Sequence, residues 1–163
     1  MDTGIFHRLK NSNSNASNVD VIHVALVDSR EAVREGIRQM LSSEKSIKII
    51  SEASDEQEAV EQIKDKSPDI IIIDIEMKDV ESADITNSLK KIIGSLKKNG
   101  GEANVIVMSD KRMLLRPAIL AGAAAYLSKN ICRSELIAAI RVVHLWRAVL
   151  FNNPKSNFAL VKL

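Results

Sequence analysis

The sequence predicts an α/β fold in which a doubly wound, five-stranded parallel sheet is covered by helices on both faces. Between about residues 20 and 150, short apolar runs alternate with segments whose apolar residues recur at helical spacing. One run, residues 70–73, consists of four consecutive isoleucines. A strand without polar alternation is typical of a parallel sheet that is buried on both faces. Because aromatic residues make up only 3% of the chain, the core must consist of Ile, Val, Leu and Ala.

Three strands and two helices are expected in the first half of the chain. The strands are the segments 21–27 and 46–53 and the isoleucine run. The first helix carries its inner face at helical spacing, with Val33, Ile37, Met40 and Leu41. The second helix follows Ser54, which forms a capping-box pattern with Gln57.

The second half of the chain predicts two further strands and three helices. Pro117 lies inside the middle helix, which is therefore expected to be short or to start close to the proline. The expected segments are a helix over 85–99, a strand over 104–108, a helix over 114–121, a strand over 123–127, and a helix from Leu136 to about Trp146.

The two ends of the chain differ in composition from the segment between them. Residues 1–19 are rich in Asn and Ser and lack sustained apolar periodicity, which predicts a flexible N-terminal tail. Residues 151–163 are expected to form a C-terminal tail or the start of a linker. A single folded domain is therefore predicted over residues 20–150.

Charge and composition exclude several classes of protein. The formal net charge of +2 gives no general case for a nucleic-acid or membrane partner. The single cysteine, Cys132, cannot form an internal disulfide, and no apolar run approaches the ~20 residues of a membrane span. We therefore expect a cytoplasmic protein that contacts neither membrane nor nucleic acid directly.

Polar side chains of specific kinds stand at the ends of the predicted strands. Asp28, Asp74 and Ser109 each end a strand, and Lys129 follows the last one. The carboxyl ends of parallel strands share one edge of the sheet, where open α/β sheets bind ligands. Two carboxylates, a hydroxyl and an ammonium suit a hard cation and a phosphoryl group, with a carboxylate as the nucleophile.

These segments together resemble the receiver domains of two-component response regulators. ALVDSREAVREGIRQML is similar to the first strand and helix of that family, and SPDIIIIDIEM to its phosphoacceptor strand. VIVMS and AGAAAYLSK are similar to the switch strand and the lysine strand. The segments VREGI and EASD most resemble the subfamily whose receiver domains usually precede a LuxR-type helix-turn-helix domain. The resemblance implies the flavodoxin-like receiver fold.

The resemblance also implies roles for individual residues. Asp74 would accept a phosphoryl group from a histidine kinase or a phosphotransfer protein. Ser109 and Tyr126 would be the switch pair, and Lys129 would contact the phosphoryl group. Such a domain is no enzyme beyond self-phosphorylation from phosphodonors and autodephosphorylation.

The acidic pocket departs from the family pattern at two positions. The resemblance implies that Asp28, Asp74 and the backbone carbonyl of Glu76 hold Mg²⁺. The second acid that usually follows the first strand is replaced by Ser29, which is a poorer ligand and is expected to cap the next helix instead. Asp110 replaces the small residue that usually follows the switch hydroxyl, and it places a second anion near the phosphoryl site. We therefore expect weakened magnesium binding.

Three functions are compatible with these residues. The first is a phosphorylated receiver that changes a protein-binding surface. The second is a pseudo-receiver, a docking or dimerisation module that works without phosphorylation, and the third is a metal-dependent phosphohydrolase with Asp74 as nucleophile. Because the sequence shows no DNA-binding module, output is expected through another protein or through self-association by the last helix and tail.

Overall fold

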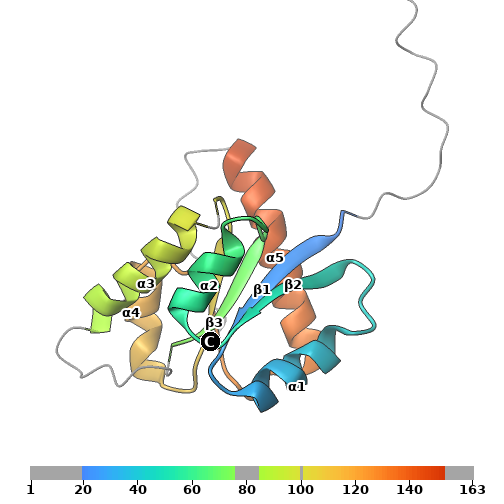
Figure 1. Cartoon of the computed structure of the whole chain (residues 1–163), viewed down its shortest axis with the longest axis horizontal. Coiled ribbons are helices and arrows are strands. Elements are labelled where there is room, and N and C mark those ends of the chain that lie inside the picture. Colours follow the sequence, from blue (N-terminus) through green and yellow to red (C-terminus); the bar gives the residue numbers. More distant parts are fainter. Residues whose placement is uncertain (1–19, 76–84, 100, 153–163) are drawn as a thin grey trace, which may run out of the picture.

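The computed structural model describes residues 20–75, 85–99 and 101–152, and within these ranges it contains the predicted five-stranded sheet (Figure 1). Neighbouring strands are all parallel and follow the order β2-β1-β3-β4-β5. The chain therefore runs outward from β1 to β2 and then in the opposite direction through β3, β4 and β5, which confirms the doubly wound topology. The strands are β1 (Ile22–Val27), β2 (Ile47–Ala53), β3 (Ile70–Asp74), β4 (Asn104–Met108) and β5 (Ala125–Leu127).

Helices cover the sheet on both sides (Figure 1). Two of them, α1 (Glu31–Leu41) and α5 (Arg133–Asn152), pack on one face. The other face is covered by α2 (Glu56–Ile63), α3 (Ile85–Asn99) and α4 (Leu115–Leu120), with a single 3₁₀ turn, Arg112–Leu114, before α4. The two layers form two separate apolar clusters, which we call the α1/α5 layer and the α2/α3/α4 layer.

The isoleucine strand explains how both layers are built on one sheet. Side chains alternate across a strand, so Ile70 and Ile72 belong to the α1/α5 layer and Ile71 and Ile73 to the α2/α3/α4 layer. Each of the four is at most 2% exposed. Full burial of one such side chain stabilises the fold by roughly 1.5–3 kcal/mol.

Several element boundaries differ from the predicted ones. β5 begins at Ala125 rather than at residue 123, and α4 is short, with Pro117 as its third residue, where a missing N–H breaks no helical hydrogen bond. The last helix begins at Arg133 and continues to Asn152, beyond the predicted end near Trp146. No glycine or proline follows Trp146 before Pro154, so nothing in the sequence stops the helix there.

Two predicted helix caps are wrong by one residue. The N-cap of α2 is Asp55, which accepts a hydrogen bond from the Glu58 amide at 2.9 Å, and Gln57 makes no part of the cap. The Glu58 carboxylate accepts from the amide and the hydroxyl of Ser54 at 2.7 and 2.8 Å. The N-cap position of α1 is Arg30, not Ser29, and its amide donates to the Asp28 carboxylate at 2.8 Å.

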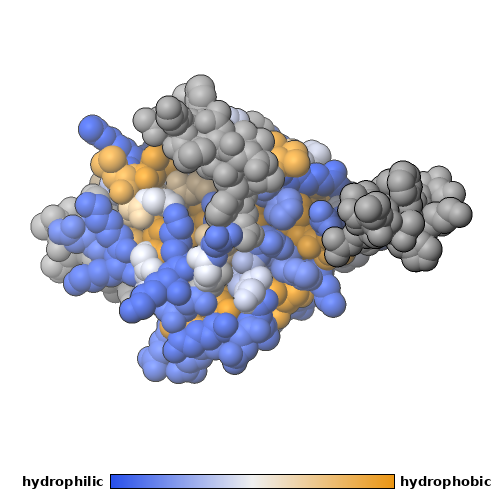
Figure 2. All heavy atoms as spheres, turned by 90° about the horizontal axis from the view of Figure 1, so that it is seen from above, coloured by the Kyte–Doolittle hydropathy of each residue, from blue (hydrophilic) through white to orange (hydrophobic). Residues whose placement is uncertain are grey.

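The predicted N-terminal tail and nearly all of the predicted C-terminal tail lie outside the described residues. In the part of the chain that the structure describes, no helix has the length and hydropathy that crossing a membrane requires. Figure 2 shows a face on which hydrophilic residues alternate with smaller hydrophobic areas. Among the residues whose side chains the structure describes, the large hydrophobic ones that are exposed are Val21, Met113, Leu120 and Leu145.

Candidate functional site

Asp28 and Asp74 lie side by side at the carboxyl edge of the sheet. The register pairs Val27 of β1 with Ile73 of β3, so the next residue of each strand is an aspartate. By strand alternation both carboxylates share the parity of Leu26 and Ile72 and lie on the face that α1 and α5 cover. Both residues are buried, Asp28 5% and Asp74 4% exposed. Two like charges on neighbouring strands repel each other unless a cation lies between them.

Arg30 supplies a cation at that place. Its guanidinium donates from Nε to Asp28 Oδ1 at 3.1 Å and from Nη2 to Asp28 Oδ2 at 3.0 Å. The same Nη2 donates to Asp74 Oδ2 at 2.7 Å. The side chain of Arg30 is 48% exposed, whereas those of Asp28 and Asp74 are 7% and 3% exposed. The guanidinium therefore covers the two carboxylates from the solvent side and bridges them.

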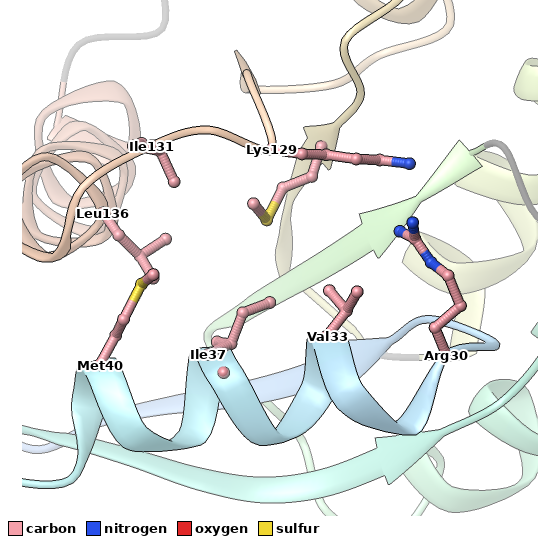
Figure 3. Close-up of a pocket in the computed structure, with 9 residues that line it drawn as sticks. Arg30, Val33, Ile37, Met40, Lys129, Ile131 and Leu136 are labelled. Carbon is pink, nitrogen blue, oxygen red and sulfur yellow. The ribbon is translucent and has the colours of Figure 1, made fainter.

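Lys129 approaches Asp74 from the loop that follows β5. Its Nζ lies 3.0 Å from Asp74 Oδ2, the oxygen that also accepts from Arg30. Figure 3 shows the cationic ends of both side chains at the tip of the β3 arrow, one on either side of it. Of the four side chains expected to converge at this edge, Asp28, Asp74 and Lys129 are thus brought together, whereas the Ser109 hydroxyl contacts the loop after β4. Counted over the described residues, the two carboxylates and two cations of this group sum to a formal charge of zero.

The predicted switch pair, Ser109 and Tyr126, holds the loop after β4 through a single residue. Ser109 is 1% exposed, and its hydroxyl accepts from the backbone N–H of Lys111 at 3.1 Å. Tyr126 is 7% exposed, and its hydroxyl donates to the backbone carbonyl of Lys111 at 2.7 Å. A displacement of either side chain would therefore act on the same loop, which leads into the 3₁₀ turn and α4.

Asp110 is directed toward the loop that carries Lys129. Its carboxylate accepts from the hydroxyl of Ser128 at 2.7 Å and from the backbone N–H of Lys129 at 2.9 Å. The anion that departs from the family pattern thus fixes the loop that presents the lysine. The other departure, Ser29, is exposed and contributes no helix cap, and Glu76 lies outside the described residues.

A cavity of about 210 Å³ adjoins the carboxylates between α1 and the start of α5 (Figure 3). Arg30 and Lys129 form its polar end, and apolar side chains such as Ile37 and Leu136 form most of the rest. The cavity therefore brings no further carboxylate to the site. Its lining residues are Arg30, Val33, Gly36, Ile37, Met40, Met108, Lys129, Ile131 and Leu136.

The described residues, as arranged, do not fit a magnesium ion. Magnesium requires oxygen ligands in octahedral geometry. Within the described ranges, no three His, Cys, Asp or Glu side chains gather around a common point. Asp28 and Asp74 are of the right chemical type, but the Arg30 guanidinium occupies both of them.

Sequence reasoning missed Arg30. The prediction was confined to residues at strand ends, whereas Arg30 lies three positions beyond the end of β1, at the N-cap of α1. A signal was nevertheless present. Two neighbouring strand-end carboxylates require a cation, and Arg30 is the first cationic residue after Asp28.

The family comparison gives a match over most of the domain. A family model described as the response regulator receiver domain matches residues 24–141. This range begins within β1 and ends within α5, so it covers most of β1, all of the other four strands and the site described above.

Curated relatives and solved structures agree with the family match. Response regulator UvrY of Escherichia coli (strain K12) is 29% identical over 143 residues, which are 88% of this chain and 63% of the relative. Transcriptional regulatory protein LiaR of Bacillus subtilis (strain 168) is 32% identical over 126 residues, 74% of this chain and 55% of the relative. The chain thus spans less than two thirds of the length of these two relatives. The signal receiver domain of NarL from Mycobacterium tuberculosis has the same fold, with a TM-score of 0.65 at 23% identity over 77% of this chain and 98% of that one.

Proposed function

The chain belongs to the family of response regulator receiver domains, and we propose that Asp74 is its phosphoacceptor. The chain is the receiver domain of a two-component response regulator, a signalling domain rather than a classical enzyme. The proposed donor is a phosphohistidine on a histidine kinase or on a phosphotransfer protein.

The position of Asp74 is the observation that carries this proposal. Its carboxylate ends the central strand, and two cations contact one of its oxygens. A carboxylate oxygen would attack the phosphorus of the donor, and a P–O bond would form as the P–N bond breaks. The leaving nitrogen keeps the electron pair of the broken bond and takes up a proton. Lys129 and Arg30 would offset the added negative charge of the acyl phosphate.

The proposed output is a change in the loop after β4. The phosphoryl oxygens would attract the Ser109 hydroxyl, which now accepts from Lys111. Because Tyr126 holds the other side of Lys111, loss of one contact alters the support of the other. The two arrangements of this loop would differ in population according to the state of Asp74. The affected surface comprises the 3₁₀ turn, α4 and β5.

The cofactor and partners are proposed at a finer level than the family shows. Receiver domains generally bind Mg²⁺, but the resting pocket of this one is proposed to have little affinity for it, because Ser29 replaces an acid and Arg30 bridges Asp28 and Asp74. Response regulators interact with histidine kinases and with output domains. The kinase, a protein output partner, and self-association through the last helix and the tail are proposals for this chain, as are the domain limits of 20–150 and a cytoplasmic location.

Incubation with a small phosphodonor, followed by intact-mass measurement, tests the proposal. We expect one added phosphoryl group in the wild type and none in Asp74→Asn. Asp69→Asn is the matched control, because Asp69 lies just before the other end of the same strand and accepts from the His23 amide. It should still be phosphorylated. A wild type that gains no mass with several donors, with or without magnesium, would favour the phosphorylation-independent docking module instead.

A further inference from the structure

We propose that Arg30 takes the place of a divalent cation in this pocket and keeps magnesium out of the resting domain. The inference concerns only the cation between Asp28 and Asp74. It holds or fails whether or not Asp74 accepts a phosphoryl group.

The geometry of Arg30 is that of a built-in bridging cation. Three of its N–H groups reach Asp28: the backbone N–H at 2.8 Å, Nε at 3.1 Å and Nη2 at 3.0 Å. The guanidinium thus binds both oxygens of Asp28 with its planar fork, the geometry that fixes orientation as well as charge. From there Nη2 extends 2.7 Å to Asp74. The backbone of Arg30 is fixed at the start of α1. The side chain therefore loses little conformational entropy when it contacts the carboxylates.

The charge balance among the described residues leaves little attraction for an added ion. Asp28 and Asp74 are already matched by Arg30 and Lys129. An incoming Mg²⁺ would have to displace the guanidinium and shed part of its water shell, which it does reluctantly. The described surroundings offer the ion few oxygen ligands in place of its water, because Ser29 is exposed and the adjoining cavity has no acidic lining residue.

Removal of Arg30 should therefore create a metal site. Lys129 contacts Asp74 but is not among the contacts of Asp28, so Arg30 alone among these two cations links both carboxylates. Without Arg30, the carboxylates of Asp28 and Asp74, whose side chains are 7% and 3% exposed, would face each other. Of the two cations described here, Lys129 would remain, and it contacts Asp74. The variant should be less stable without metal, and magnesium should restore what the guanidinium supplied.

Thermal unfolding in EDTA and in millimolar magnesium chloride tests the inference without any phosphodonor. The wild-type Tm should be the same in both buffers. Arg30→Ala and Arg30→Gln should have a lower Tm in EDTA and regain it in magnesium. Calorimetric titration should show magnesium affinity at least about tenfold above wild type, a modest figure because Arg30 is half exposed.

Arg38→Ala is the matched control, because Arg38 lies on the same helix and pairs with Glu31, Glu35 and Glu52 instead. It should lower Tm without making it magnesium-dependent. Asp28→Asn added to Arg30→Gln should abolish the gained binding, which locates the ion. Should magnesium stabilise the wild type as much as it stabilises the Arg30 variants, the inference is wrong. It is equally wrong if neither variant binds magnesium more tightly than the wild type, and Arg30→Gln, which keeps most of the side chain, decides the matter if Arg30→Ala does not fold.

Discussion

At the scale of single residues, Asp110 links the two sides of the site. Its carboxylate receives the Ser128 hydroxyl and the Lys129 amide, and the Lys129 ammonium in turn contacts Asp74. A residue on the loop after β4 thus determines where the cation from the loop after β5 stands. The Asp110 carboxylate thus positions Lys129, and its described contacts are to the protein itself.

We predict that Asp110→Ala loosens the Lys129 loop. The loss of two partly exposed hydrogen bonds should lower the free energy of unfolding by about 0.5–1 kcal/mol. Urea unfolding measures this change. The control is Asp65→Ala, because Asp65 is exposed and lies between α2 and the start of β3. It should lower the free energy of unfolding less than Asp110→Ala does. An Asp110→Ala protein as stable as the wild type would show that these contacts are not maintained in solution.

The residues of the site differ in how far sequence can predict them. Asp28, Asp74, Ser109 and Lys129 were predicted because strand ends follow from apolar runs, and parallel strands bring their ends to one edge. Arg30 was not, because its role depends on a long side chain turning back across the end of its own loop. Strand and helix periodicity describes backbones, and it does not show where the end of an arginine side chain lies.

At the scale of elements, the N-terminus of α2 shows the same limit. The capping-box pattern was recognised, yet two overlapping patterns, Ser54 with Gln57 and Asp55 with Glu58, fit the same helix start. The backbone geometry decides for the second, with Asp55 in an extended conformation at the N-cap. Strand positions were predicted more closely because a shift by one residue would turn each apolar side chain to the wrong face.

We predict that the contribution of Glu58 to stability depends on pH. The Ser54 backbone amide, followed by the Ser54 hydroxyl, holds the pKa of Glu58 below its ordinary value. A carboxylate with a lowered folded-state pKa stabilises the fold above its unfolded-state pKa, and that stabilisation is lost as the pH falls through the folded-state value. Glu58→Ala should therefore cost about 0.5–1 kcal/mol at neutral pH and less in acid.

Urea unfolding at neutral and acidic pH measures this difference. Gln57→Ala is the control on the same turn, and it should change stability little at either pH because Gln57 is exposed and outside the cap. A cost for Glu58→Ala that is equal at both values of pH would contradict the assignment.

At the scale of the whole molecule, one sheet joins two apolar layers that share no helix. The α1/α5 layer lies on the face that holds the paired carboxylates, whereas Tyr126, proposed as a switch residue, packs in the α2/α3/α4 layer. Phosphorylation of Asp74 would thus begin on one face of the sheet and affect the other. All five strands contribute side chains to both layers. Among them β3 is the central strand and ends in Asp74, so we expect the packing of β3 to couple the site to the surface around α4.

We predict that Ile71→Val and Ile72→Val destabilise the domain equally, and that both layers still unfold in a single transition. These neighbours on β3 are 0% and 2% exposed and face opposite layers, and removal of one buried methylene should cost each variant about 0.5–1.5 kcal/mol. Trp146, the only tryptophan, lies half-buried on α5, so its fluorescence reports the unfolding of that helix, whereas far-UV circular dichroism reports all helices. The urea transitions from both probes should coincide in both variants, because a sheet shared by the layers cannot lose one of them alone. If Ile71→Val shifts the dichroism transition and leaves the Trp146 transition unchanged, the layers unfold separately, and β3 does not couple them.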